Sequence, residues 1–205
     1  MRKPHSREKT SDCYSAGERT YMELTQKMRG VLLRPLLSLL TVCRINADGL
    51  TLLSLLAGLA ACPAYYYGRE YFLLLLLLHV VLDGLDGPLA RYQKTASRRG
   101  SFTDTMSDQI VVAATTITLI YDGVAGVIPG VAYVFLYTVI IAFSMIRNAM
   151  GIPYRWLIRP RFTVYVWLVV EFYIRPGTVD YLLWFFTVVL ALAMARGFYR
   201  IRKKL

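Results

Sequence analysis

The feature that most constrains this chain is a series of long apolar runs separated by short polar or glycine- and proline-rich connections. A helix needs about 20 residues to cross the hydrocarbon core of a bilayer, and we find six segments that approach this length. We expect these spans at residues 50–68, 71–92, 101–121, 126–147, 161–174 and 179–199. The fifth is the weakest, because it is short and contains Glu171. The pattern predicts an all-α, polytopic membrane bundle of six transmembrane helices.

Cations gather on every second connection of this predicted bundle. Lysine and arginine follow the second, fourth and sixth spans, whereas Arg69 and Arg175 are the only cations on the other connections. Cytoplasmic loops of membrane proteins are enriched in lysine and arginine. The alternation therefore predicts that both termini are cytoplasmic.

The chain divides into three parts. Residues 1–20 are polar and basic, and we expect them to be flexible. Residues 21–45 form an apolar run interrupted by cations and by Pro35, which predicts a juxtamembrane amphipathic segment on the cytoplasmic face. A kinked seventh span is the alternative. Residues 46–205 form the six-helix domain. The net charge of +11 does not indicate a nucleic-acid partner, because a chain that is 56% hydrophobic leaves little room for a soluble scaffold.

Two pairs of aspartates lie at the same depth in adjacent predicted spans. Asp83 and Asp86 come near the inner end of the second span, and Asp104 and Asp108 near the beginning of the third. At about 1.5 Å per residue, both pairs are roughly 5–12 Å from the cytoplasmic boundary of the core. The spacings i, i+3 and i, i+4 place each pair on one helical face. We therefore expect the four carboxylates to meet.

Four carboxylates in a membrane require compensating positive charge. A single aspartate in a span costs about 2.5–3.5 kcal/mol on insertion scales. Carboxylate oxygens suit a hard cation, Mg²⁺ or Mn²⁺, and four carboxylates can hold two ions. Two ions close together are typical of sites that transfer a phosphoryl group.

Other interpretations stay open at this point. The DGLDG stretch could form a turn, with the later aspartates capping a helix, although this leaves the matched depth of the two pairs unexplained. A cation channel or transporter also buries carboxylates, but it would be indifferent to nucleotides. A catalytically inactive scaffold would be expected to have lost a carboxylate, and none of the four is lost.

The residues around these aspartates resemble the signature of the CDP-alcohol phosphotransferase, or CDP-alcohol phosphatidyltransferase, family: D-x2-D-G-x2-A-R-x8-G-x3-D-x3-D. The chain matches every fixed position and every spacing. The matching residues are Asp83, Asp86, Gly87, Ala90, Arg91, Gly100, Asp104 and Asp108. The resemblance implies the compact membrane type with six spans preceded by an amphipathic helix.

The resemblance also implies a role for each matching residue. Asp108 would be the general base and also a metal ligand. The other implied metal ligands are Asp83, Asp86 and Asp104. The implied CDP-binding residues are Gly87, Ala90, Arg91 and Gly100. Family members carry Pro-Asn-x-x-Thr or Pro-Asp-x-x-Thr where the first span begins. Asp48 and Thr51 match this pattern and Ala47 replaces the proline, so we assign Asp48 and Thr51 to the same nucleotide site.

The resemblance implies transfer of a phosphatidyl group from CDP-diacylglycerol to a polar alcohol, with release of CMP and an active site near the cytoplasmic face. It also suggests a homodimer. Arginines at the inner ends of the spans favour a phosphate-bearing acceptor, glycerol 3-phosphate or inositol phosphate. The residues that we assign to the acceptor are Arg147, Arg155 and Arg196. The alternative is an aminoalcohol phosphotransferase that uses a soluble CDP-alcohol and diacylglycerol. We expect His79, in mid-span, to pack or to hydrogen-bond between helices.

Overall fold

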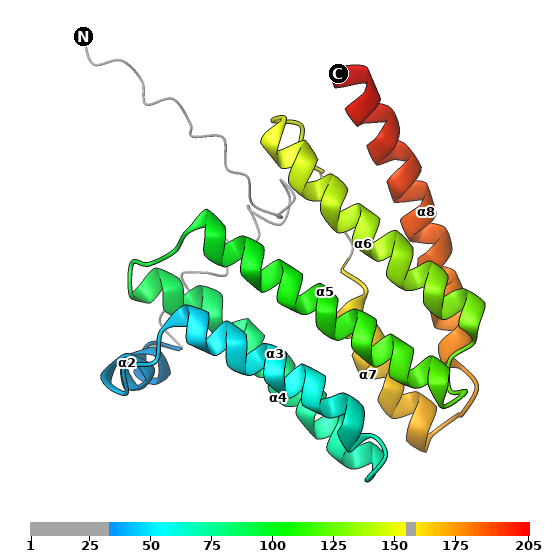
Figure 1. Ribbon diagram of the computed structural model, residues 1–205, viewed down its shortest axis with the longest axis horizontal. Helices are drawn as coiled ribbons and strands as arrows, with labels where there is room; N and C mark the ends of the chain where they lie inside the picture. Colours follow the sequence, from blue (N-terminus) through cyan, green and yellow to red (C-terminus); the bar gives the residue numbers. More distant parts are fainter. Residues whose placement is uncertain (1–32, 155–158) are drawn as a thin grey trace.

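The computed structural model describes residues 33–154 and 159–205, and in these ranges every regular element is a helix (Figure 1). The helices are α2 (Arg34–Val42), α3 (Ala47–Ala64), α4 (Arg69–Tyr92), α5 (Arg98–Tyr121), α6 (Val127–Ala149), α7 (Arg161–Tyr173) and α8 (Val179–Lys204). The all-α prediction is therefore confirmed for this part of the chain. The predicted flexible segment 1–20, residues 21–32 of the amphipathic segment and Arg155 lie outside the described residues.

The helices follow the predicted spans closely, and local capping explains where the ends differ. The first span begins three residues earlier than expected, because the Asn46 side chain caps α3 by accepting a hydrogen bond from the Gly49 N–H at 2.7 Å. Ser97 caps α5 in the same way and accepts from the Gly100 N–H at 3.0 Å. The last helix continues to Lys204, with three basic residues in its last turn, where cations are favourable.

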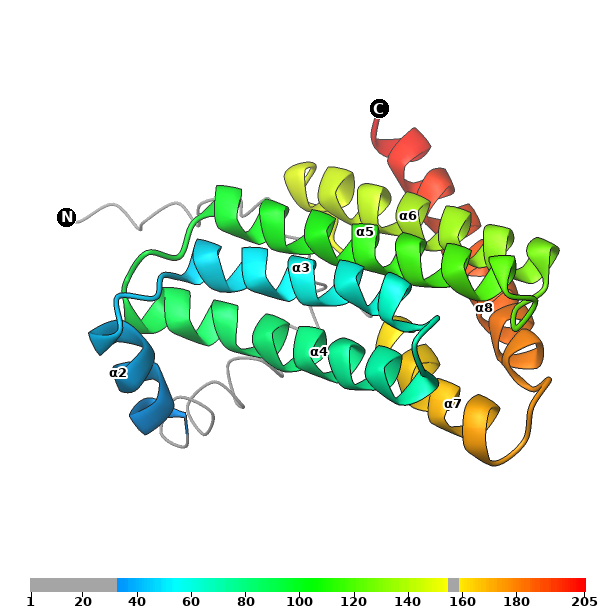
Figure 2. The same cartoon turned by 60° about the horizontal axis from the view of Figure 1, so that its bottom comes forward.

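Helices α3 to α8 pack as a closed ring. Helix α3 packs against both α4 and α5, α5 against α6, and α6 against α8. Helix α8 then packs against α7, and α7 against α4. Figure 2 shows α3 lying between α4 and α5. Helices α3 and α5 lie close together at Gly58 of α3, where an added Cβ would lie 2.5 Å from a methyl of Val111 on α5. The lack of a side chain at Gly58 therefore sets the spacing of α3 and α5.

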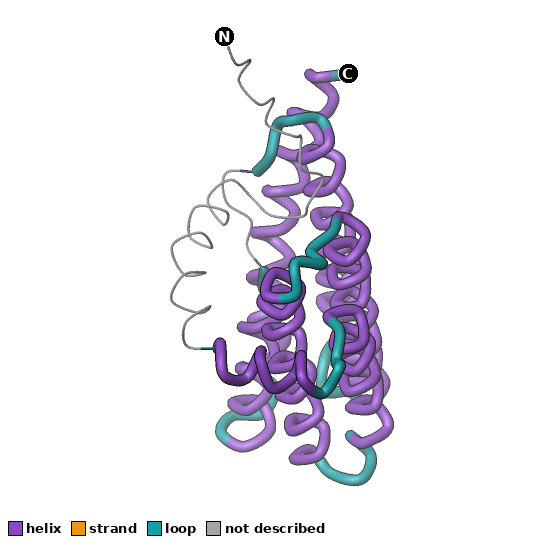
Figure 3. Tube along the Cα trace, turned by 90° about the vertical axis from the view of Figure 1, so that its left-hand side faces the viewer, coloured by secondary structure: helices purple, strands orange, loops and turns teal. Residues whose placement is uncertain are grey.

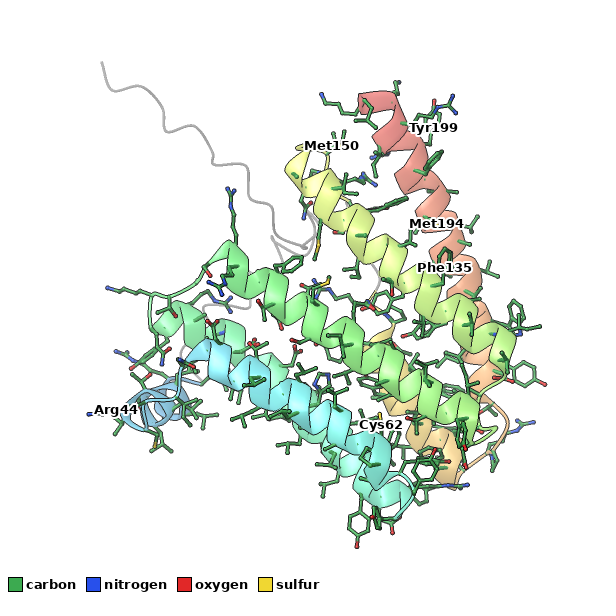
Figure 4. All side chains as sticks on the ribbon, in the orientation of Figure 1. Arg44, Cys62, Phe135, Met150, Met194 and Tyr199 are labelled. Carbon is green, nitrogen blue, oxygen red and sulfur yellow. The ribbon has the colours of Figure 1, made fainter. Side chains whose placement is uncertain are left out.

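The two ends of the bundle differ in charge. In Figure 1 the beginnings of α3 and α5 and the ends of α4, α6 and α8 lie toward the top and left. In Figure 4, Arg44 lies by α2, and Met150 and Tyr199 lie at the ends of α6 and α8. On this side Lys94 follows the end of α4, and Lys203 and Lys204 lie in the last turn of α8. These basic segments, which follow alternate predicted spans, therefore share one end of the bundle.

Helix α2 runs across the long helices instead of along them (Figure 3). It packs Leu37 against Leu50 of α3 and Leu89 of α4. Its opposite face leaves Leu39 and Val42 exposed. This is an amphipathic arrangement, and it covers only the described part of the predicted juxtamembrane segment.

The apolar outer surface identifies an integral membrane protein. Within the described ranges, four helices (α3, α4, α6 and α8) are long and apolar enough to cross a membrane. Large apolar side chains cover their outer faces, among them Leu74 at 62% exposure and Phe135 at 61%. Helix α5 carries the second aspartate pair, and α7 has only 13 residues. Length and composition therefore support four spans, and the count of six remains a prediction.

Helix α7 tolerates a carboxylate because that carboxylate is fully partnered. Glu171 is 4% exposed and accepts hydrogen bonds from the N–H groups of Gly177, Thr178 and Val179, at 2.5–2.7 Å. The Thr178 hydroxyl also donates to it, at 3.1 Å. Glu171 thus ties the end of α7 to the beginning of α8, where the helix dipole favours negative charge.

Candidate functional site

The carboxylates of α4 and α5 meet, as predicted. Oxygens of Asp83, Asp104 and Asp108 lie within 4.8 Å of one another. Helix α4 continues without a break through Gly84, Gly87 and the proline that follows. The turn interpretation of DGLDG is therefore wrong, and the helical spacing places the aspartates on one side of α4.

Asp86, the fourth aspartate, is anchored to α3. The Thr51 hydroxyl donates to Asp86 Oδ2 at 2.7 Å, and both residues are less than 10% exposed. Thr51 stands one turn into α3, and its place follows from the Asn46 cap that starts this helix. The predicted nucleotide residue Thr51 and the predicted metal ligand Asp86 thus form one hydrogen-bonded unit.

A pocket opens beside this unit, between the beginnings of α3 and α5 and the end of α4. All six residues that the sequence assigned to CDP line it, together with Asp86 and Asp104. These six are Asp48, Thr51, Gly87, Ala90, Arg91 and Gly100. Sequence reasoning missed five further lining residues: Ala47, Thr95, Ala96, Ser97 and Ser101. Ser97 had a detectable signal, because a serine three residues before Gly100 is typical of a helix cap.

The two glycines of the pocket are not required by the packing of the protein itself. A Cβ added at Gly87 would lie 3.5 Å from the nearest atom, in Arg91, and a Cβ added at Gly100 would lie 3.4 Å from Ser97 Oγ. These are ordinary contact distances. The small size of both residues leaves the pocket wall flat and its backbone accessible to a ligand.

A buried arginine lies within the carboxylate cluster. Arg161, the first residue of α7, is 4% exposed. It donates through Nη2 to Asp83 Oδ2 at 2.7 Å and pairs through Nη1 with Asp108 Oδ2. Sequence reasoning assigned Arg147, Arg155 and Arg196 to the acceptor and did not select Arg161 for the site. Arginines at the inner ends of spans commonly set the topology of a membrane protein. The sequence alone does not show whether such an arginine is exposed or is a buried partner of a carboxylate.

Asp108 has one oxygen available for a ligand. Its Oδ1 is buried and has no hydrogen-bond partner among the described residues. His79 Nε2 lies 3.9 Å from this oxygen, beyond hydrogen-bond distance. The other ring nitrogen of His79 contacts Ser54 Oγ at 2.8 Å. His79 therefore joins α3 to α4, which confirms the expected interhelical hydrogen bond.

The donor set fits a hard divalent cation. Three carboxylates converge, one of their buried oxygens lacks a partner in the described part of the chain, and no sulfur or imidazole is needed to complete the group. The protein therefore supplies a set of carboxylate oxygens of the kind that Mg²⁺ and Mn²⁺ prefer.

The predicted acceptor arginines are placed differently from one another. Arg147 is 2% exposed, donates to the carbonyls of Ile152 and Pro153, and stacks 3.8 Å over the Tyr154 ring. It thus stabilises the connection after α6. Arg196 is exposed on α8, which packs against α6 and α7.

A second, apolar cavity lies between α4 and α7. Leucines of α4, among them Leu73 and Leu77, face Phe162, Val166 and Val169 of α7 across it. Among the described residues that line it, Glu70 alone is charged. An apolar cavity of this kind suits a hydrocarbon chain.

Comparison with known proteins gives a consistent family. The family model described as CDP-alcohol phosphatidyltransferase matches residues 38–198, which is most of the chain. An archaetidylinositol phosphate synthase from Aeropyrum pernix is 34% identical over 105 residues, or 51% of this chain and 47% of that protein. A CDP-diacylglycerol–serine O-phosphatidyltransferase from Mycobacterium bovis is 31% identical over 110 residues, or 52% of this chain and 38% of the relative. The chain thus spans less than half the length of these curated relatives, and no solved structure matches it.

Proposed function

Since the chain belongs to the CDP-alcohol phosphatidyltransferase family, we propose that it transfers a phosphatidyl group from CDP-diacylglycerol to a polar alcohol and releases CMP. The observation that carries this proposal is that the pocket and the carboxylate cluster are adjacent and share a residue. Asp86 and Asp104 line the pocket that holds all six expected nucleotide residues, and Asp104 also belongs to the cluster. A nucleotide in this pocket has its phosphates beside the carboxylates.

We assign the metal site to Asp83, Asp86, Asp104 and Asp108, with two Mg²⁺ or Mn²⁺ ions. When bound, divalent cations would neutralise negative charge on the pyrophosphate and on the oxygens of the phosphoryl group under attack. The protein holds the carboxylates in place through Thr51 on Asp86 and through the packing of α3 between α4 and α5.

The reaction itself uses one proton transfer. Asp108 accepts the proton of the acceptor hydroxyl as general base. The resulting oxygen attacks the phosphorus that bears diacylglycerol, the bond from this phosphorus to the bridging oxygen of the pyrophosphate breaks, and CMP leaves. Arg91, on the pocket wall, pairs with a phosphate of the nucleotide. Positioning and electrostatic stabilisation provide most of the rate enhancement in such transfers.

The membrane arrangement follows from the lipid donor. We propose six spans, with α5 and α7 crossing together with the four more apolar helices, and with the basic end of the bundle in the cytoplasm. The CDP group then enters at the cytoplasmic face. The acyl chains stay in the bilayer, where the apolar cavity between α4 and α7 offers a suitable surface. A homodimer in the membrane is part of the same proposal.

The acceptor is proposed to carry a phosphate, as glycerol 3-phosphate or inositol phosphate does. The support is the positive charge at this end of the bundle, with Arg161 next to Asp108 and Arg147 at the end of α6. The protein from Aeropyrum pernix is named as an archaetidylinositol phosphate synthase. The mycobacterial relative is named for serine, which has no phosphate, so serine must be tested as well.

The test is CMP release by the purified protein with CDP-diacylglycerol and Mg²⁺. Glycerol 3-phosphate, inositol 1-phosphate, inositol and serine are supplied separately, with a blank that contains no acceptor. We expect release with a phosphorylated acceptor and none in the blank. Release with serine alone would refute the acceptor assignment and keep the reaction. No release with any of the four, together with no CMP binding, would refute the transferase and favour the cation transporter. CMP binding without release would point to the aminoalcohol alternative, which a soluble CDP-alcohol and diacylglycerol would then test.

A further inference from the structure

Arg161 places its positive charge directly beside the carboxylates of the cluster. One guanidinium contacts Asp83 of α4 and Asp108 of α5 from the beginning of α7, and so joins three helices. Its side chain is buried, and the Phe162 ring lies 4.5 Å from its central carbon. Arg161 is therefore built into the carboxylate cluster.

The same carboxylates are two of the three whose oxygens converge within 4.8 Å. A cation held by these oxygens lies within a few ångströms of the guanidinium. Two positive groups at that distance repel each other strongly, because a buried site screens charge poorly. The carboxylates of Asp83 and Asp108 thus have two competing partners, one inside the chain and one from solution.

We propose that Arg161 is the internal counterion of this cluster: it neutralises Asp83 and Asp108 before a divalent cation enters, competes with that cation for them, and turns away when the cation binds. This inference rests on the proposed metal role of the aspartates. Its benefit is that a group of carboxylates in a membrane never stands without positive charge, a state that would be costly. Its consequence is that cation binding frees one positive side chain beside the reacting groups.

A purely structural ion pair makes a different prediction. If Arg161 only held the three helices in place, its removal would loosen the cluster and weaken cation binding. If Arg161 competes with the cation, its removal tightens binding. The sign of the change in metal affinity therefore separates the two roles without any measurement of activity.

The experiment is a titration of Mn²⁺ into the full-length protein, purified in detergent and free of nucleotide, with the dissociation constant read by calorimetry and by the electron paramagnetic resonance of free Mn²⁺. We compare wild type, Arg161→Gln and Arg161→Lys. We expect Arg161→Gln to bind Mn²⁺ about tenfold more tightly, or about 1.4 kcal/mol. Arg161→Lys keeps the charge but lacks the two-pronged contact, so its affinity should fall between the two.

The matched control is Arg175→Gln. Arg175 is exposed and follows the opposite end of α7, so the same charge is removed about 20 Å away. Its affinity for Mn²⁺ should equal that of wild type. A gain in Arg175→Gln as large as that in Arg161→Gln would reduce the effect to net charge and overturn the inference.

Thermal unfolding of the same proteins provides a second readout. In EDTA, Arg161→Gln should unfold at a lower temperature than wild type, and Mn²⁺ should raise its unfolding temperature more than it raises that of wild type. A variant that needs a cation during purification is prepared in Mg²⁺, which is then exchanged. Unchanged or weaker Mn²⁺ affinity in both Arg161 variants refutes the counterion even if CMP is released. Tighter Mn²⁺ binding by Arg161→Gln than by wild type supports it even if no acceptor gives CMP release.

Discussion

Helix α7 carries a buried charge at each end, and the carboxylate at its far end provides a stability prediction. Glu171 accepts from three backbone N–H groups and one hydroxyl at the beginning of α8. In Glu171→Gln the amide oxygen can face one side of this group, and the NH₂ then faces a backbone N–H on the other. One buried donor is left without a partner, at about 1–3 kcal/mol, and the remaining bonds each lose roughly 1 kcal/mol of charge assistance.

Contributions of this kind overlap and do not add fully. We therefore expect Glu171→Gln to lower the free energy of unfolding by about 3–5 kcal/mol, somewhat less than the simple sum. For a chain of this size, such a loss lowers the unfolding temperature by roughly 10 °C. The assay is thermal unfolding in detergent, followed by intrinsic fluorescence. Trp167 is a suitable reporter, because its indole N–H donates to Thr178 Oγ at 3.0 Å within the same junction.

Glu70→Gln is the control, since Glu70 is an exposed carboxylate in the first turn of α4. Its unfolding temperature should match that of wild type. If Glu171→Gln shifted the unfolding temperature by less than about 2 °C, the hydrogen bonds at the α7–α8 junction would contribute far less than their number implies, and the explanation of how α7 tolerates Glu171 would be wrong.

Three further predictions concern the site and the helices that build it. Gly58→Ala should cost about 1–3 kcal/mol of unfolding free energy, because the added methyl meets Val111; thermal unfolding checks this, and Val111→Ala in the same chain should restore part of the loss. Thr51→Val should cost about 1–3 kcal/mol of unfolding free energy and weaken CMP binding about tenfold by equilibrium titration, because the buried Asp86 loses its donor. EDTA should abolish CMP release, and Mg²⁺ or Mn²⁺ should restore it; release that persists in EDTA would contradict the metal assignment.

The helices and the aspartates could be predicted because each rests on a local pattern. Long apolar runs set the helices, and the spacings of Asp83–Asp86 and Asp104–Asp108 set their faces. Both pairs fall near the same end of neighbouring antiparallel helices, so their meeting follows from helix length together with these spacings. The exact helix ends did not follow, because they depend on side-chain caps such as Asn46.

The role of Arg161 could not be predicted, because it depends on the direction in which a side chain points. Arg147 and Arg161 both lie beside the connection between α6 and α7, and from the sequence they are equivalent topology determinants. In the structure Arg147 turns to loop carbonyls and Arg161 turns to Asp83 and Asp108. Only the packing of α7 against α4 and α8 separates the two.

The most direct test of the central claim compares wild type with Asp108→Asn in two assays, CMP binding and CMP release from CDP-diacylglycerol in Mg²⁺ with the acceptor that supports turnover. Asp122→Asn, the same change at the other end of α5, is the control and should behave as wild type does. The account predicts that Asp108→Asn still binds CMP, because Asp108 does not line the nucleotide pocket, and that it releases none from the lipid donor. Full release by Asp108→Asn would show that another group takes the acceptor proton, and the absence of CMP binding in wild type would contradict the nucleotide pocket itself.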